Sequence, residues 1–100
     1  MKAPQVYVIR SGAFAKVGYS RDPESRLRQI RIHAPEPAWL AAVFPGGRDL
    51  EFRLHHYLRE HHVHDEWFNW CDKLAALIER GLPEFPPYPP GSPFVAERAA

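Results

Sequence analysis

The sequence predicts an α+β domain: a small three-stranded, mainly antiparallel sheet flanked by helices. Three observations support this class. Two strand-like segments meet at a Ser11-Gly12 turn, a helix start follows at Asp22-Pro23, and a third apolar segment (38–44) lies between two helical ones. This order is typical of a sheet with helices on its faces. The chain of 100 residues is long enough for one domain with a modest core, burying roughly 60–70% of its unfolded surface.

The first two strands are predicted as a hairpin. Residues 5–10 alternate apolar and polar side chains and are rich in β-branched and aromatic types, which indicates a strand. Ser11-Gly12 is a turn signal, and residues 14–19 form the partner strand. Gly18, near the end of that strand, indicates a close approach of another group or a bulge.

The helices have clear boundaries in the sequence. Asp22 as N-cap and Pro23 as first helical residue start a helix over 23–33, with Leu27 and Ile30 on its inner face. An apolar stripe predicts a second helix over 48–60. Residues 66–68 are expected as a short strand or an anchored loop. A third helix spans 72–80 and ends at Gly81.

The expected organisation is a folded domain over residues 1–81 and a proline-rich C-terminal tail over 82–100. The tail holds six of the eleven prolines, which exclude helix and central strand. A lone Cys71 excludes a disulfide framework within one chain. The chain shows neither a signal-peptide pattern nor an apolar run of the roughly 18 residues that a membrane span needs, so we expect a cytoplasmic protein.

Charge is unevenly distributed along the chain. The net charge is +1, but residues 1–34 carry +5 and the remainder carries −4. A basic segment on a nearly neutral whole fits an anionic ligand held on one face, although a solvated helix surface gives the same count.

Several residues of this basic third have side chains suited to phosphate chemistry. Tyr7, Lys16 and Arg26 offer a phenol and two cations, and Glu51 and His55 lie one turn apart on the second predicted helix. Each has a plainer alternative. Tyr7 could pack under a helix, Lys16 could extend along a sheet edge, Arg26 and Glu51 could form an ion pair, and His55 could be a hydrogen-bonded helix histidine.

Over residues 5–70 these positions resemble the GIY-YIG nuclease superfamily. Val6-Tyr7-Val8 stands at the first motif and keeps its tyrosine, while Lys16-Val17-Gly18 matches the second with lysine in place of tyrosine. Arg26 follows Lys16 by the family's ten residues. An E-x3-H pair at Glu51 and His55 and an acidic-Trp-Phe stretch over 65–68 are most similar to the compact phage and bacterial branch of the meiotically up-regulated gene 113 type.

The sequence also departs from the family pattern. Tyr7 has no preceding glycine, and Ile30 stands where many members have histidine or tyrosine.

The resemblance implies a metal-dependent endonuclease that hydrolyses phosphodiester bonds in DNA, with RNA as the alternative substrate. Glu51 would hold Mg²⁺ or Mn²⁺, which need only one carboxylate beside substrate and water. Arg26 and Lys16 would contact the phosphate, and His55 would orient Glu51 or move a proton. Tyr7 would orient or deprotonate the water, provided that a cation such as Lys16 lowers its pKa. Expected substrate contacts are Gly18, Arg21, Arg28 and His33.

Other functions remain open from the sequence. The domain could be a weakly catalytic nucleic-acid-binding module of the same fold, or an interaction domain that uses its tail. No specificity domain accompanies the predicted fold, so a homodimer or a partner protein would supply specificity. The histidines between 55 and 64 lack zinc-site spacing and a thiolate, which favours a surface run. The three tryptophans are expected in core or anchoring positions, with an exposed one able to stack a base.

Overall fold

The computed structural model describes residues 2–85. Its elements, in chain order, are β1 (Gln5–Ser11), β2 (Phe14–Ser20), α1 (Pro23–His33), β3 (Ala38–Pro45), α2 (Arg48–Tyr57), η1 (Arg59–His61), β4 (His62–His64), β5 (Trp67–Asn69) and α3 (Asp72–Arg80). The α+β class predicted from the sequence is confirmed. None of the helices in the described part is long and apolar enough to cross a membrane.

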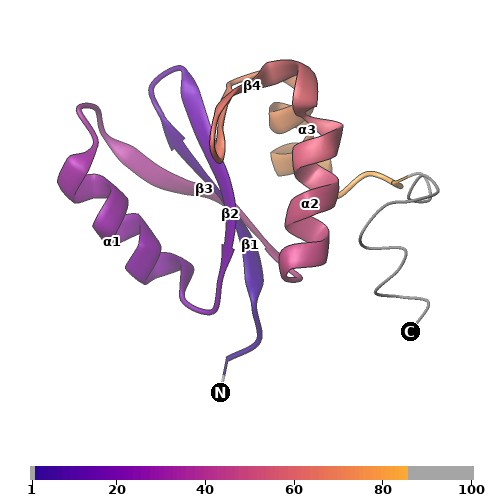
Figure 1. Ribbon diagram of the computed structural model, residues 1–100, viewed down its shortest axis with the longest axis horizontal. Coiled ribbons are helices and arrows are strands. Elements are labelled where there is room, and N and C mark those ends of the chain that lie inside the picture. Colours follow the sequence, from indigo (N-terminus) through magenta and orange to yellow (C-terminus); the bar gives the residue numbers. More distant parts are fainter. Residues whose placement is uncertain (1, 86–100) are drawn as a thin grey trace.

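The sheet has five strands in the order β3-β1-β2-β5-β4, and every neighbouring pair is antiparallel. The prediction of three strands was therefore wrong. The two additional strands are only three residues long each, and β4 is fully exposed. A three-residue strand is too short to show alternation by itself, because β5 forms by pairing with β2 and β4 forms by pairing with β5. The short strand or anchored loop expected over 66–68 corresponds to β5. Figure 1 shows α1 on one face of the sheet and α2 with α3 on the other.

Local sequence signals set the boundaries of several elements. The hairpin turn holds Gly12 at a φ of 59°, a conformation that glycine adopts at little cost. Asp22 Oδ1 accepts a hydrogen bond from the Ser25 backbone N–H at 3.1 Å, so the predicted N-cap of α1 is confirmed. The predicted helix over 48–60 ends sooner, at Tyr57, and a short 3₁₀ turn follows it. Gly81, at a φ of 85°, ends α3 as expected.

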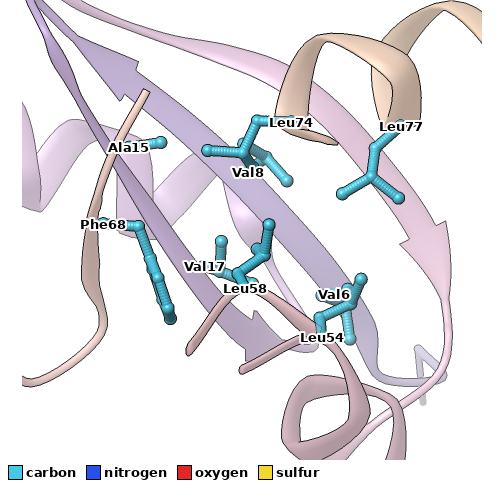
Figure 2. Close-up of a cluster of buried hydrophobic side chains, with 9 residues drawn as sticks. All are labelled: Val6, Val8, Ala15, Val17, Leu54, Leu58, Phe68, Leu74 and Leu77. Atoms are coloured by element: carbon cyan, nitrogen blue, oxygen red, sulfur yellow. The ribbon is translucent and has the colours of Figure 1, made fainter. Parts of the chain in front are cut away.

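The hydrophobic core lies mainly between the sheet and the α2–α3 layer. Figure 2 shows the side chains of this cluster, which come from β1, β2, β5, α2 with the residue that follows it, and α3: Val6, Val8, Ala15, Val17, Leu54, Leu58, Phe68, Leu74 and Leu77. A smaller cluster on the opposite face joins Tyr7 and Ile9 of β1 to Leu27 of α1. Because strand side chains alternate, one face of β1 supplies the main core and the other faces α1.

The predicted division at residue 81 falls close to the end of the described part. Phe85 still packs edge-on against Tyr57 of α2, with ring centroids 5.9 Å apart. Contacts with the domain therefore continue a few residues past Gly81. The rest of the proline-rich tail, 86–100, lies outside the described residues.

Candidate active site

The strand register of the hairpin brings Tyr7 opposite Gly18. The pairs Tyr7–Gly18 and Ile9–Lys16 face each other across β1 and β2, so Tyr7, Lys16 and the open side of Gly18 share the α1 face of the sheet. A Cβ atom added at Gly18 would lie 2.7 Å from Tyr7 Cζ and 2.7 Å from Glu66 Oε2. The absence of a side chain at Gly18 is therefore what lets the phenol and a carboxylate meet.

The Tyr7 hydroxyl lies at the bottom of this site, beside the Arg26 guanidinium. Tyr7 is fully buried, and its hydroxyl has no well-formed hydrogen bond within residues 2–85. Burial raises the pKa of Tyr7, and the approach of Arg26 opposes that rise without cancelling it. The sequence suggested that Lys16 would lower this pKa. The opposing cation is instead Arg26, and the net direction is upward because burial disfavours the phenolate more strongly.

Two side chains of α2 form hydrogen bonds with the backbone of β2 at Val17 and Tyr19. The Val17 carbonyl accepts a 2.7 Å hydrogen bond from His55 Nε2, and the Tyr19 backbone N–H donates to the Glu51 carboxylate. Residues one helical turn apart are separated by about 5.4 Å along the helix axis. This is close to the roughly 6.7 Å that separates alternate residues along a strand. A glutamate and a histidine four positions apart can therefore bind alternate residues of one strand edge, which gives the E-x3-H spacing a structural reason.

Glu66 belongs to the site and was missed in the assignment of site residues from the sequence. Asp65, at a φ of 49°, turns the chain between β4 and β5, and the Glu66 carbonyl accepts a 2.9 Å hydrogen bond from the Val17 N–H. The Glu66 carboxylate then faces Lys16, with Oε2 and Nζ 3.8 Å apart. The available signal was the position of Glu66, directly before a short aromatic strand that pairs with β2.

Two carboxylates from different parts of the chain thus interact electrostatically at this site. Burial and the neighbouring negative charge of Glu66 raise the pKa of Glu51 to about 7. The pKa of Glu51 is lowered, to a smaller extent, by the Tyr19 backbone N–H, Arg48 and Lys16. A raised carboxyl pKa beside a second carboxylate marks a position where positive charge would be favourable.

The donor set fits a hard divalent cation. Glu51 Oε2 and Glu66 Oε2 are both buried and lack a hydrogen-bond partner within the described residues. Mg²⁺ is commonly held by one or two carboxylates, with water and substrate phosphate completing its ligands. Two carboxylates close enough for Glu66 to raise the pKa of Glu51 match that requirement.

The remaining predicted site residues lie at varying distances from this centre. His33 lines a pocket that adjoins Lys16 and Arg26. Arg21 is exposed in the connection between β2 and α1, and Arg28 is exposed two positions after Arg26, on another side of α1. The plainer alternative of an Arg26–Glu51 ion pair is not what forms, because Arg26 Nη1 donates to Gln29 Oε1 at 3.1 Å and the guanidinium faces Tyr7.

Two residues of the histidine run make contacts within the β4–β5 hairpin. His62 Nε2 lies 2.8 Å from the Asp65 carbonyl oxygen, and His64 Nδ1 lies 3.4 Å from Asp65 Oδ2. Across residues 2–85, no group of three or more His, Cys, Asp or Glu side chains is arranged to hold a metal ion. The candidate cation site therefore has two protein carboxylates at most.

Comparison with known proteins places the chain in a family. The T5orf172 domain family matches residues 5–80, which include every element from β1 to α3. The chain belongs to this family. Neither the curated proteins nor the solved structures contain a significant match.

Proposed function

We propose that this protein is a metal-dependent endonuclease of the GIY-YIG type that hydrolyses phosphodiester bonds in DNA. One observation carries the proposal: a buried phenol, two cations and two carboxylates lie close enough around Gly18 to interact electrostatically. They come from five separate parts of the chain, so simple surface charge does not account for their convergence. Membership of the T5orf172 domain family and the spacing of the GIY-YIG-like motifs support the same function.

Glu51 and Glu66 would hold Mg²⁺ or Mn²⁺ at Oε2, the oxygen of each carboxylate that accepts no hydrogen bond, and Glu66 would give up its ion pair with Lys16 to do so. When bound, such a cation supplies Lewis-acid stabilisation of the charge on the phosphate and on the departing oxygen. Glu66 adds a second carboxylate to the single glutamate that the resemblance implies.

Arg26 and Lys16 are the phosphate-binding residues in this proposal. The Arg26 guanidinium stays charged at every relevant pH and is suited to gripping two phosphate oxygens. Lys16, whose side chain is about one-fifth exposed (19%), already neutralises part of the Glu66 charge and can turn to an incoming phosphate. It stands where the second tyrosine of the GIY-YIG pattern would be, so this chain places charge at that position instead of a hydroxyl.

Tyr7 and His55 act through hydrogen bonds rather than as free bases. With its pKa raised, the Tyr7 phenol is protonated at neutral pH and can orient a water molecule at the phosphate. His55 uses Nε2 to donate to the Val17 carbonyl, which leaves only Nδ1 available. We therefore assign His55 as a positioning residue for Glu51 and β2.

Plasmid nicking tests the proposal. The wild-type protein should relax supercoiled DNA in Mg²⁺ or Mn²⁺, and Arg26→Ala and Glu51→Gln should each lose at least about 100-fold in rate. Arg80→Ala, which removes an exposed cation on α3, is the matched control and should keep wild-type activity. Equal rates in wild type, Arg26→Ala and Glu51→Gln would rule out this active site.

A nucleic-acid-binding module of weak activity is the second candidate. The raised pKa of Tyr7 and the lysine at position 16 favour it, because both remove a readily ionised phenol from the site. Retained DNA binding with no nicking in either metal would establish it. In both cases we place the protein in the cytoplasm, with a homodimer or a partner protein supplying sequence specificity.

A further inference from the structure

A pocket of about 660 Å³ adjoins the active site on the α1 face of the sheet. It lies between α1, the β1–β2 turn and the β4–β5 hairpin, and it shares Lys16 and Arg26 with the site. Helix α1 packs mostly over β3 and less over β1 and β2, and the pocket lies beside it, over Phe14 and Lys16 of β2 and Trp67 of β5. The volume of the pocket is within the roughly 300–1,000 Å³ of ordinary small-molecule sites.

The floor and walls of this side pocket are apolar and partly aromatic. Phe14 and Lys16 on β2 and Trp67 on β5 lie on one face of the sheet by their register, and Val63 and Ile30 contribute from β4 and α1. Phe14 is 44% exposed and Val63 is 42% exposed. Large apolar side chains exposed inside a hollow mark a binding site more than a defect of folding.

The polar groups in the side pocket are placed to form hydrogen bonds with the edge of a flat ligand. Gln29 Oε1 accepts a hydrogen bond from Arg26, which leaves both N–H groups of the Gln29 amide free to donate. His33 on α1 and His64 on β4 also line the pocket. A flat ring with donors and acceptors on its rim would find matching partners here.

The position of the charged groups next to the apolar surface indicates which ligand the side pocket binds. Lys16 Nζ lies 5.7 Å from the Trp67 ring centroid, so phosphate-binding charge and apolar surface are adjacent. A nucleotide has the same order, with an anionic phosphate joined through one sugar to a flat base. We infer that the side pocket receives one unpaired nucleobase next to the phosphate held by Lys16 and Arg26. This inference rests on the proposed endonuclease function and names its substrate as DNA with an extrahelical or single-stranded nucleotide.

Base pairing explains why the nucleotide must be unpaired. In a duplex the faces of each base are stacked, and the grooves offer only base edges. A base can reach a pocket of this kind only after it leaves the stack, which costs least where it has no partner. Stacking on aromatic side chains stabilises the base in the pocket, so the pocket favours DNA in which the base is already free.

Binding to three DNAs tests the inference: a matched duplex, the same duplex with one extrahelical thymidine, and its single strand. Fluorescence anisotropy in EDTA measures affinity without cleavage. The wild-type protein should bind the second and third DNAs roughly 5- to 100-fold more tightly than the first. Phe14→Ala and Val63→Ser, at positions exposed enough to preserve folding, should remove most of that preference while changing matched-duplex affinity less than about twofold. Trp39→Ala, which removes a tryptophan outside the pocket, should keep it.

Equal wild-type affinity for the three DNAs would overturn the inference, as would a preference that survives in both pocket variants. Cleavage of the same DNAs in Mn²⁺ separates it from the proposed function. If cleavage requires Glu51 but is equally fast with and without an unpaired nucleotide, the endonuclease function is supported and the role of the pocket is refuted. A pocket-dependent binding preference without Glu51-dependent cutting keeps the base site and removes the endonuclease.

Discussion

At the scale of single residues, the site depends on one missing side chain. Gly18 is buried where β2 passes Tyr7, and the space that a Cβ would fill is already taken by the phenol and by Glu66. The glycine thus links the packing of the sheet to the chemistry of the cleft. A change there should be felt in both stability and activity.

Gly18→Ala should lower the free energy of unfolding by about 1–3 kcal/mol, as overpacking in a close-packed interior does. Urea denaturation measures this loss. In the double variant Gly18→Ala, Tyr7→Phe the two effects should be less than additive, because removing the hydroxyl relieves part of the clash. Strict additivity would show that the alanine acts elsewhere.

The raised pKa of Glu51 predicts a specific pH dependence in metal-free protein. The folded state binds this proton more tightly than the unfolded state, since the pKa moves from 4.5 to about 7. Stability from this group is therefore complete below about pH 4.5 and declines as pH rises to about 7. After discounting for solvent screening, we expect a loss on the order of 1–2 kcal/mol.

Thermal unfolding in EDTA between pH 4.5 and 8 measures this decline. Glu51→Gln should flatten it, while Glu60→Gln, which removes an exposed carboxylate, should leave the wild-type profile. Parallel profiles for wild type and Glu51→Gln would contradict the assigned cause.

At the scale of elements, α2 and the β4–β5 hairpin complete the site by binding the edge of β2. Val17 is the junction, since its N–H donates to the Glu66 carbonyl and its carbonyl accepts from His55. The His55 ring also packs edge-on against Phe68, with centroids 5.0 Å apart. These contacts fix the helix, the strand and the hairpin relative to one another.

His55→Ala should reduce stability by about 1–2 kcal/mol, because it leaves the partly buried Val17 carbonyl without its partner. It should also weaken Mn²⁺ binding about tenfold or more by freeing the element that carries Glu51. His55→Gln, whose amide can donate to the same carbonyl, should recover most of both losses. Isothermal titration with Mn²⁺ alongside urea denaturation distinguishes this positioning role: full metal affinity in His55→Ala would refute it.

The same elements show where sequence reasoning succeeds. Alternation and the Asp22 cap are local signals, so the hairpin and α1 were predicted within one residue of their bounds. The grouping of Tyr7, Lys16, Arg26 and Glu51 into one site rested on the resemblance to the GIY-YIG motifs, and their catalytic roles stay predictions. Strand β5, which forms by pairing with the distant β2, was expected only as a short strand or an anchored loop over 66–68, and β4, which pairs with β5, was not predicted. Glu66 was missed for the same reason, because its place in the site follows from that pairing.

At the scale of the whole molecule, the site lies where the two layers meet across the sheet. Arg26 comes from the helix on one face, Glu51 from a helix on the other, and Glu66 from the hairpin at the edge between them. Neither layer alone contains the site. The two carboxylates are therefore adjacent only in the folded protein, and a cation that binds both must stabilise the whole domain by mass action.

Mn²⁺ at about 100 times its dissociation constant should raise the free energy of unfolding by about 2.7 kcal/mol. For a domain of this size each kcal/mol corresponds to about 4–8 °C in Tm, so the shift is readily measured by thermal unfolding. The double variant Glu51→Gln, Glu66→Gln should lose the shift and gain stability in EDTA, since it removes two mutually repelling carboxylates. Glu60→Gln should retain the full shift. If the double variant kept it as well, Mn²⁺ would be binding elsewhere, and the convergence of Glu51 and Glu66 would have no role in holding a metal.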